Sequence, residues 1–227
     1  VEAHPGEGIR TNILGTKIVA DCCRAANVAA MVLISTDKAV NPTSVMGASK
    51  RIAETYCQAL DIVENAPSES AKGGTRYITV RFGNVLGSTG SVVPLFQRQL
   101  ASGGPLTVTH PDMQRYFMTV REAVELVLEA SVLGTRDARE PGKIYVLDMG
   151  DPIKIMDLAR QMILLAGKKP EIDIRIEITG LRPGEKLYEE ILHDSEPPET
   201  TDYAGILLAA PRTAELDPLS EIIESLV

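Results

Sequence analysis

Two short predicted strands with polar residues after them constrain the fold of this chain more than any other feature. Residues 30–35 read AMVLIS and residues 76–82 read RYITVRF. The first is a continuous apolar run, which is typical of a strand buried on both faces of a parallel sheet, and the second has the β-branched and aromatic residues of a strand. Residues 9–26 and 45–60 show apolar residues at helical spacing and flank the first run. This alternation predicts a doubly wound α/β sheet.

The remaining chain predicts shorter elements of both kinds. Residues 61–75 are polar and rich in serine and glycine, which indicates a surface loop, and residues 83–90 (GNVLGSTG) are a glycine-rich exit from the second strand. Further strands are expected at residues 106–109, 116–120, 143–149 and 172–179, and further helices at residues 94–102, 121–133 and 155–166. We therefore expect the C-terminal part of a Rossmann-type doubly wound parallel sheet at residues 1–87, joined to a smaller α/β lobe at residues 88–227.

Composition narrows the range of functions. The formal net charge of -8 argues against a nucleic-acid-binding protein, which needs a basic surface. Apolar residues make up 44% of the 227 residues, which is enough for a sizeable core, and no apolar run approaches the roughly 20 residues that span a bilayer. The three cysteines contain no CxxC pair and the three histidines lack ligand spacing, so no metal site is expected.

Polar residues follow both predicted strands at their carboxyl ends. The first exit is residues 35–38 (STDK), and the second runs from residue 83 to residue 91. Ligands of doubly wound sheets bind outside the carboxyl ends of the strands, so both exits are expected to face one cleft. On the helix after the first exit, Met46 and Lys50 are four residues apart and therefore share one face.

Short-chain dehydrogenases carry a Tyr-x-x-x-Lys pair at the place of Met46 and Lys50, and Met46 cannot carry the proton that their tyrosine accepts. Five segments in order define a narrower resemblance: NILGT at residues 12–16, ISTDKAVNPTSVMGASKR at 34–51, VRFGNVLGSTGSVVPLF at 80–96, VTHPDMQRYFMT at 108–119 and GLRPGEKLYEE at 180–190. In these segments the chain resembles the polysaccharide-biosynthesis nucleoside-diphosphate-sugar 4,6-dehydratases. These are extended short-chain dehydrogenases/reductases of the UDP-N-acetylglucosamine 4,6-dehydratase type, and their large members have methionine in the tyrosine position.

The resemblance implies a hydro-lyase that uses NAD, with NADP not excluded, and a UDP-N-acetylhexosamine as substrate. Hydride leaves carbon 4 for the cofactor and returns at carbon 6 after water is lost, so no cofactor is consumed. By resemblance, Asp37 protonates the departing hydroxyl of carbon 6 and Lys38 removes the proton of carbon 5. Thr36 would orient the hydroxyl of carbon 4 in place of the tyrosine.

The same resemblance assigns binding residues. Residues expected at the cofactor are Asn12, Ser35, Lys50, Phe82, Gly83 and Val85, with Lys50 on the nicotinamide ribose. Residues expected at the substrate are Asn84, Ser91, Val92, Thr107, Arg115, Arg182 and Glu185. Both arginines are candidate diphosphate ligands, because a guanidinium offers a planar fork of donors. Residues 1–87 would thus be the C-terminal part of an NAD-binding domain, and residues 88–227 mainly the UDP-sugar lobe.

The chain departs from a complete enzyme of this type, because it contains neither the glycine fingerprint that cradles the cofactor pyrophosphate nor the acidic residue that reads the adenine ribose. We therefore expect a C-terminal piece of a longer enzyme with little activity by itself. The whole protein is expected to be a cytoplasmic homo-oligomer, anchored upstream at the inner face of the cell membrane.

Two alternative functions stay open. One is a UDP-sugar 4-epimerase or reductase of the same superfamily, against which Met46 counts because those reactions rely on the tyrosine. The other is a non-catalytic module of a glycan-assembly complex, against which the intact Thr36-Asp37-Lys38 triplet counts.

Overall fold

The computed structural model describes residues 1–65, 74–88, 90–136, 141–210 and 214–226, and it divides into two compact units. Unit 1 consists of Val1–Phe82, Val124–Asp148 and Glu190–Val227, and unit 2 consists of Gly83–Ala123 and Met149–Glu189. The single boundary expected at residue 87 therefore does not describe the compact units. The chain returns to unit 1 because residues 144–147 and 206–209 add strands to its sheet. The assignment of one part to the cofactor and the other to the substrate stays a prediction.

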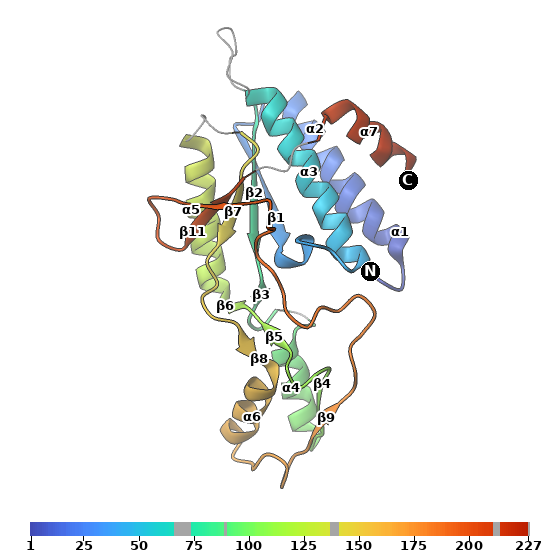
Figure 1. Ribbon diagram of the computed structural model, residues 1–227, viewed down its shortest axis with the longest axis vertical. Coiled ribbons are helices and arrows are strands. Elements are labelled where there is room, and N and C mark those ends of the chain that lie inside the picture. Colours follow the sequence, from blue (N-terminus) through green and yellow to red (C-terminus); the bar gives the residue numbers. More distant parts are fainter. Residues whose placement is uncertain (66–73, 89, 137–140, 211–213, 227) are drawn as a thin grey trace. The chain divides into compact units, whose positions relative to one another are not determined.

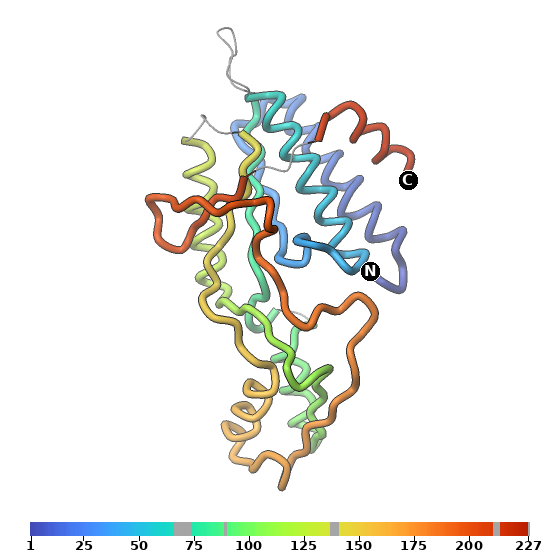
Figure 2. The backbone as a smooth tube through the Cα atoms, viewed as in Figure 1, coloured from blue at the N-terminus to red at the C-terminus, as the bar shows by residue number. Residues whose placement is uncertain are grey.

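Unit 1 is built on a five-stranded sheet in the order β1-β2-β7-β11-β10 (Figure 1). Its strands are β1 (Ala30–Thr36), β2 (Arg76–Phe82), β7 (Ile144–Leu147), β10 (Pro198–Thr200) and β11 (Ile206–Ala209). β1, β2 and β7 are mutually parallel, which confirms the parallel pairing expected for the two predicted strands. β11 is antiparallel to both of its neighbours, and Figure 2 shows this C-terminal segment returning beside β7.

Helices cover both faces of this sheet (Figure 1). Tyr77 and Ile78 of β2 point to opposite faces, since side chains alternate along a strand. Tyr77 is buried in a cluster with residues from α2, α3 and α7, whereas a Cβ on Gly134 of α5 would lie 2.6 Å from Ile78. The helical segments are α1 (Pro5–Gly8), the π-helix η1 (Ile9–Leu14), α2 (Gly15–Ala25), the 3-10 helix η2 (Asp37–Ala39), α3 (Val45–Asn65), α5 (Val120–Arg136) and α7 (Leu216–Ser225).

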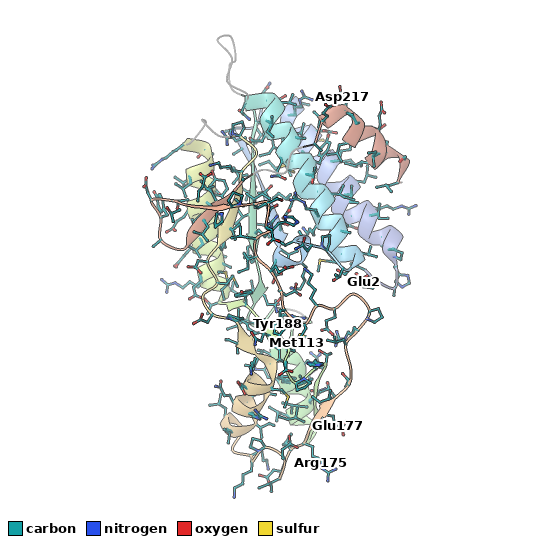
Figure 3. The ribbon with its side chains drawn as sticks, viewed as in Figure 1. Glu2, Met113, Arg175, Glu177, Tyr188 and Asp217 are labelled. Carbon is teal, nitrogen blue, oxygen red and sulfur yellow. The ribbon has the colours of Figure 1, made fainter. Side chains whose placement is uncertain are left out.

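Unit 2 combines short two-stranded sheets with two helices. β3 (Asn84–Val85) pairs with β6 (Phe117–Met118), β4 (Leu106–Val108) pairs with β9 (Ile176–Ile178), and β5 (Gln114–Arg115) pairs with β8 (Ile153–Lys154). The helices are α4 (Val92–Ala101) and α6 (Ile155–Leu165). Met113 is labelled in Figure 3 and belongs to their buried core, whose other members are Phe96, Leu106, Val108, Ile155, Ala159, Ile163 and Ile174.

Helix α3 is longer than predicted, because residues 61–65 continue the helix instead of opening a surface loop. Asp61 is buried and accepts hydrogen bonds from the amides of Tyr77 at 2.8 Å and Gly142 at 2.7 Å. Burial raises the pKa of Asp61, although these bonds and the Arg76 guanidinium act in the opposite direction. The polar composition of residues 61–65 thus reflects bonds made inside the unit. Residues 66–73 of the predicted loop lie outside the described residues.

The predicted strand at residues 172–179 is shorter in the structure, because residues 172 and 173 form a turn, Ile174 makes an isolated bridge with Pro170, and β9 covers Ile176–Ile178. Glu171 has a φ of 64°, and Asp173 Oδ2 accepts a hydrogen bond from the Lys169 amide at 2.8 Å. The turn buries Ile174 and leaves Ile172 77% exposed. A turn with this exposure pattern produces the same apolar–polar alternation as a half-exposed strand, so the predicted start of the strand at residue 172 was wrong, whereas Ile176–Ile178 form a strand as predicted.

Within the described ranges, the structure contains no helix with the length and apolar character needed to cross a bilayer.

Candidate active site

The first candidate site is the exit of β1, where Thr36, Asp37 and Lys38 follow one another. The Thr36 hydroxyl accepts a hydrogen bond from the Lys38 amide at 3.4 Å, which caps η2, and donates to Asp37 Oδ1 at 2.8 Å. Lys38 Nζ donates to the same oxygen at 2.9 Å. The hydroxyl of Thr36 and the ammonium group of Lys38 therefore meet on one carboxylate oxygen of Asp37.

The carboxylate of Asp37 is fully buried, whereas the side chain of Lys38 is 26% exposed. Among the residues that the structure describes, Asp37 Oδ2 has no hydrogen-bond partner. Leaving such a buried acceptor without a hydrogen bond costs about 1–3 kcal/mol of folding free energy, so unsatisfied acceptors are rare in native proteins. One oxygen of Asp37 is thus held by its neighbours, and the other is buried without a hydrogen-bond partner among the described residues.

Helix α3 approaches this loop closely at Gly47. A Cβ at this position would lie 2.2 Å from the carbonyl oxygen of Lys38, so only glycine permits the approach. The start of α3 is held by Glu2, whose carboxylate accepts hydrogen bonds from the amides of Val45 and Met46 at 3.0 Å each. These bonds lower the pKa of Glu2, which is labelled in Figure 3. Glu2 therefore holds the start of α3, and the glycine at position 47 allows the helix to lie close to the loop.

Met46 and Lys50 lie on the first turns of α3, and Asn12 of η1 is bonded to Ser49 of the same helix. Lys50 Nζ donates to the Ile34 carbonyl of β1 at 2.9 Å, and burial lowers the pKa of this ammonium group. Asn12 Nδ2 donates to the hydroxyl of Ser49 at 2.9 Å, and that hydroxyl donates to the Met46 carbonyl at 2.9 Å. Asn12 lies in the π-helix η1, a conformation that is frequent at functional sites.

The end of β2 meets the same sheet edge, because Phe82 is the register partner of Thr36. The next predicted residues, Gly83, Asn84 and Val85, begin unit 2. There the Asn84 amide donates to the Tyr116 carbonyl at 3.1 Å, and β3 pairs with β6. Convergence of Asn84 with the loop stays a prediction.

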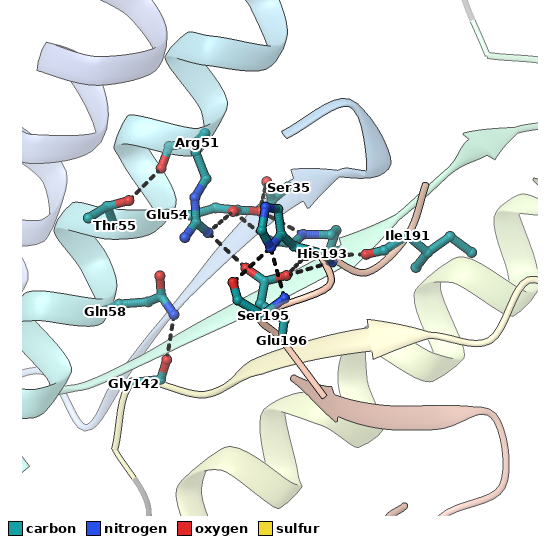
Figure 4. Close-up of polar contacts among 11 residues, drawn as sticks. Ser35, Arg51, Glu54, Thr55, Gln58, Gly142, Ile191, His193, Ser195 and Glu196 are labelled. Atoms are coloured by element: carbon teal, nitrogen blue, oxygen red, sulfur yellow. Dashed lines mark hydrogen bonds and ion pairs between the residues drawn. The ribbon is translucent and has the colours of Figure 1, made fainter. Parts of the chain in front are cut away.

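The hydroxyl of Ser35 is bonded inside unit 1. Ser35 is buried, and its hydroxyl donates to Glu54 Oε1 at 2.6 Å (Figure 4). The hydroxyl is therefore committed to a carboxylate of α3, and the cofactor role of Ser35 stays a prediction.

Arg115 of unit 2 is also committed to its own surroundings. It is buried, and its Nη1 and Nη2 donate to the backbone carbonyls of Gln114, Leu187 and Lys186 at 2.7, 3.2 and 2.7 Å. The Glu189 carboxylate lies 3.7 Å from its Nε. These contacts hold residues 186–189 against β5, and they occupy donors that the predicted diphosphate role would need.

Arg182 and Glu185 form a local turn in unit 2. The amide of Arg182 donates to Glu185 Oε2 at 3.1 Å, and the amide of Glu185 donates to the Arg182 carbonyl at 3.0 Å. Arg182 is exposed, in contrast to Arg115. Of the two arginines, Arg182 is thus the one whose guanidinium reaches solvent.

The predicted uridine-binding residues lie around α4. Ser91 precedes the helix, and its buried hydroxyl has no hydrogen-bond partner among the described residues. Val92 packs against the unit 2 core. The Thr107 hydroxyl accepts a hydrogen bond from Gln99 Nε2 at 2.7 Å, so Thr107 is held by α4.

A buried charged set was missed by the sequence analysis: Arg51, Glu54, Arg81 and Glu196. Removing one partner of such a buried set costs about 3–5 kcal/mol, because a charge is left uncompensated. The signal was Arg81, a charged residue inside the predicted strand at residues 76–82, because a charged side chain that is buried in a sheet requires a partner. Within the described residues, no group of three or more His, Cys, Asp or Glu side chains is arranged to hold a metal ion.

The parallel sheet, its polar strand exit and the Met46–Lys50 spacing define a Rossmann-type protein of the extended short-chain dehydrogenase/reductase class. More specifically, the chain belongs to the polysaccharide biosynthesis protein family, which matches residues 1–211.

Two curated relatives illustrate the range of this similarity. The chain is 56% identical over 196 residues to the capsular polysaccharide biosynthesis protein CapD of Staphylococcus aureus, which covers 86% of this chain and 30% of that protein. It is 35% identical over 205 residues to the UDP-glucose 4-epimerase of Rickettsia akari, which covers 90% of this chain and 55% of that protein. The chain thus spans less than two thirds of either relative.

Solved structures confirm the predicted fold class. Pen from Bacillus thuringiensis aligns with a TM-score of 0.79 and 34% identity, covering 94% of this chain and 61% of that one. The dTDP-glucose 4,6-dehydratase DesIV of Streptomyces venezuelae, solved with NAD and TYD, aligns with a TM-score of 0.66 and 21% identity. That alignment covers 81% of this chain and 57% of DesIV.

Proposed function

We propose that this chain carries the catalytic loop of a nucleotide-sugar 4,6-dehydratase that acts on a UDP-N-acetylhexosamine in polysaccharide biosynthesis. The observation that carries the proposal is the loop itself, where Thr36 and Lys38 both donate to the buried carboxylate of Asp37. Met46 occupies the position of the tyrosine in those enzymes of this class that rely on a phenol, and its side chain has no transferable proton. The combination favours elimination over simple oxidation or reduction.

Elimination needs an acid for the departing hydroxyl and a base for the neighbouring C–H proton, within reach of one another. In this proposal, neutral Lys38 takes the proton of carbon 5, and protonated Asp37 gives its proton to the hydroxyl of carbon 6, which leaves as water. The proton that the hydroxyl of carbon 4 loses on oxidation would reach Asp37 through the Thr36 hydroxyl, which donates to Asp37 Oδ1 at 2.8 Å. Lys38 would return its proton to carbon 5 when hydride adds at carbon 6, so both groups end the cycle as they began it. The hydroxyl of Thr36 would hold the oxygen of carbon 4.

NAD is the proposed cofactor, with NADP as the alternative. When bound, it takes hydride from carbon 4 and returns it at carbon 6. The residues fit its nicotinamide ribose, because an ammonium has three donors and Lys50 gives one of them to Ile34. The relationship to DesIV, which was solved with NAD, supports the same cofactor. Asn12, Phe82, Gly83 and Val85 would border the nicotinamide, and Asn84 would face the substrate.

For the substrate, we assign Arg182 rather than Arg115 to the diphosphate, because Arg182 is exposed and Arg115 is engaged by carbonyls. Glu185, Ser91, Val92 and Thr107 remain the proposed nucleoside contacts. We also propose that the whole protein is a homo-oligomer anchored at the inner face of the membrane. Cell fractionation and light scattering of the polypeptide that the gene encodes would test both points.

The second candidate is a 4-epimerase, favoured by the 35% identity to a UDP-glucose 4-epimerase. The deciding experiment incubates the polypeptide that the gene encodes with UDP-N-acetylglucosamine and with UDP-glucose, and analyses the products by mass spectrometry and NMR. Loss of one water with a new ketone supports the dehydratase. An epimer of unchanged mass supports the second candidate, and no product supports a non-catalytic role. Residues 1–227 alone are expected to turn over little substrate, because they contain no glycine-rich pyrophosphate loop.

A further inference from the structure

The buried charged set of unit 1 lies beside the loop without being part of it (Figure 4). Arg81 of β2 is fully buried, and its Nε and Nη2 donate to the two oxygens of Glu54 at 3.1 and 2.8 Å. Its Nη1 donates to Glu196 Oε2 at 2.8 Å and to the Ile191 carbonyl at 3.2 Å. Arg51 Nη1 lies 2.9 Å from Glu54 Oε2 and 3.4 Å from Glu196 Oε1. These contacts hold the guanidinium group of Arg81 in place.

The set balances its charges with two guanidinium groups and two carboxylates, all at least largely buried. Burial alone would disfavour ionised Glu196, but the hydrogen bond and charge of Arg81, together with the charge of Arg51, lower the pKa of its carboxyl. Glu196 is therefore a carboxylate at neutral pH. It supplies one of the two negative charges that hold Arg81.

The set reaches the loop through Ser35, the residue that precedes Thr36. The Ser35 hydroxyl donates to Glu54 Oε1 at 2.6 Å, the oxygen that also accepts from Arg81 Nε. A continuous path of hydrogen bonds thus runs from Glu196 through Arg81 and Glu54 to Ser35. Each donor in this path is bonded to a buried carboxylate, and hydrogen bonds in such a buried network strengthen one another.

A second contact connects the same C-terminal segment to the far side of the loop. Asn41 Nδ2 donates to Glu190 Oε2 at 3.2 Å. We call residues 190–196 the brace segment, because Glu190 contacts the end of the loop and Glu196 contacts the path to its beginning. Residues on both sides of the loop are therefore connected to one short stretch of chain, Asn41 directly through Glu190 and Ser35 through Glu54, Arg81 and Glu196.

We propose that Glu196 is a positioning residue for the Thr36-Asp37-Lys38 loop, acting through Arg81, Glu54 and Ser35. The inference rests on the proposed function of that loop. Proton transfer depends steeply on placement, and a displacement of about 1 Å caused from a distance can cost about a hundredfold in rate. Substrate affinity arises in other residues and should not depend on the brace segment.

The test is Glu196→Gln in the polypeptide that the gene encodes, which keeps the shape of the side chain and removes its charge. We expect kcat to fall by about tenfold to a hundredfold with KM for the UDP-sugar unchanged. Amide hydrogen exchange, followed by mass spectrometry, should become faster in residues 35–41. The matched control is Glu199→Gln, the same change in a carboxylate that is 54% exposed and pairs with Lys143 at the surface. The control should keep the wild-type kcat and exchange.

Ser35→Ala is the second variant, and it decides the question if Glu196→Gln does not fold. It removes the last hydrogen bond of the path and leaves all four charges in place, so it should lower kcat without raising KM. Where both variants fold, kcat of the double variant should be only slightly lower than kcat of the more strongly affected single variant. Wild-type kcat in either variant, or faster exchange in the brace segment alone, would overturn the inference. If the wild-type protein makes no keto-deoxy sugar, the proposed function fails, and the exchange measurement still decides the positioning role.

Discussion

The loop of unit 1 and the arginine group of unit 2 were predicted from the same resemblance, and the structure treats them differently. In unit 1 the predicted groups bond to one another, because Thr36 and Lys38 both donate to Asp37. In unit 2 the Arg115 guanidinium bonds to carbonyls of its own unit, and Arg182 extends into solvent. Groups that transfer protons must be assembled before substrate arrives, whereas one exposed arginine can adapt to an anion when it binds.

The largest effect is expected in the assembled group. Lys38→Ala and Asp37→Asn should each lower the rate of dehydration by about a hundred- to ten-thousand-fold, because each removes a proton-transfer group. KM for the UDP-sugar should stay nearly unchanged, since neither side chain is proposed to bind nucleotide or diphosphate. Steady-state kinetics of the polypeptide that the gene encodes, with product analysis, measures both quantities.

The matched control is Lys168→Ala, an exposed lysine of unit 2 outside both candidate groups, which should keep wild-type kinetics. A Lys38→Ala enzyme with near-native turnover would remove Lys38 as the base. Equal losses in binding and rate would mean that Lys38 serves affinity rather than proton transfer.

The second effect concerns the close approach of α3 to the loop. Gly47→Ala places a Cβ 2.2 Å from the Lys38 carbonyl, so helix and loop must separate. We expect kcat to fall by about tenfold to a hundredfold, because the catalytic groups move while the substrate contacts remain. Gly6→Ala is the control, since its Cβ would meet nothing within 4 Å. If both variants have the same kcat, α3 does not set the loop position.

The same contrast explains what could be predicted from the sequence. β1 was recognisable because it is continuously apolar, β2 because it is rich in β-branched and aromatic residues, and the loop because its residues are consecutive. The expected burial of β1 on both faces was wrong, because β1 ends the strand order of the sheet and Ile34 is 42% exposed. The end of α3 and the extent of β9 depend on tertiary contacts, those of Asp61 and Ile174, that composition does not reveal. The bond between Arg81 and Glu196 joins residues 115 positions apart, and only the fold brings them together.

The third effect tests the division of roles between the two arginines. Arg182→Ala should raise KM for the UDP-sugar by about tenfold to a hundredfold, as expected for one charge-assisted contact to diphosphate, with little change in the unfolding midpoint. Arg115→Ala should instead lower the free energy of unfolding by about 1–3 kcal/mol, because carbonyls of residues 186 and 187 lose their donors. Calorimetry measures the stability of both variants, and steady-state kinetics measures their KM for the UDP-sugar. If Arg115→Ala keeps the native free energy of unfolding and raises KM, Arg115 rather than Arg182 binds the diphosphate.

The smallest effect is expected at Met46, which shares a turn of α3 with Lys50 but carries no transferable proton. Met46→Tyr adds a phenol where the proposed cycle already runs without one, so the rate of dehydration should fall by less than about tenfold, since no proton-transfer group is lost. Met46→Leu is the control for side-chain size and should behave like the wild type. The informative measurement is the product mixture, followed by NMR with both UDP-sugars. A phenol within reach of Lys50 could serve oxidation at carbon 4, so a small gain of epimer beside an intact dehydratase activity would fit the proposed roles. A tyrosine variant that dehydrates much faster than the wild type would contradict them, because Thr36 would then be a poor substitute for the phenol.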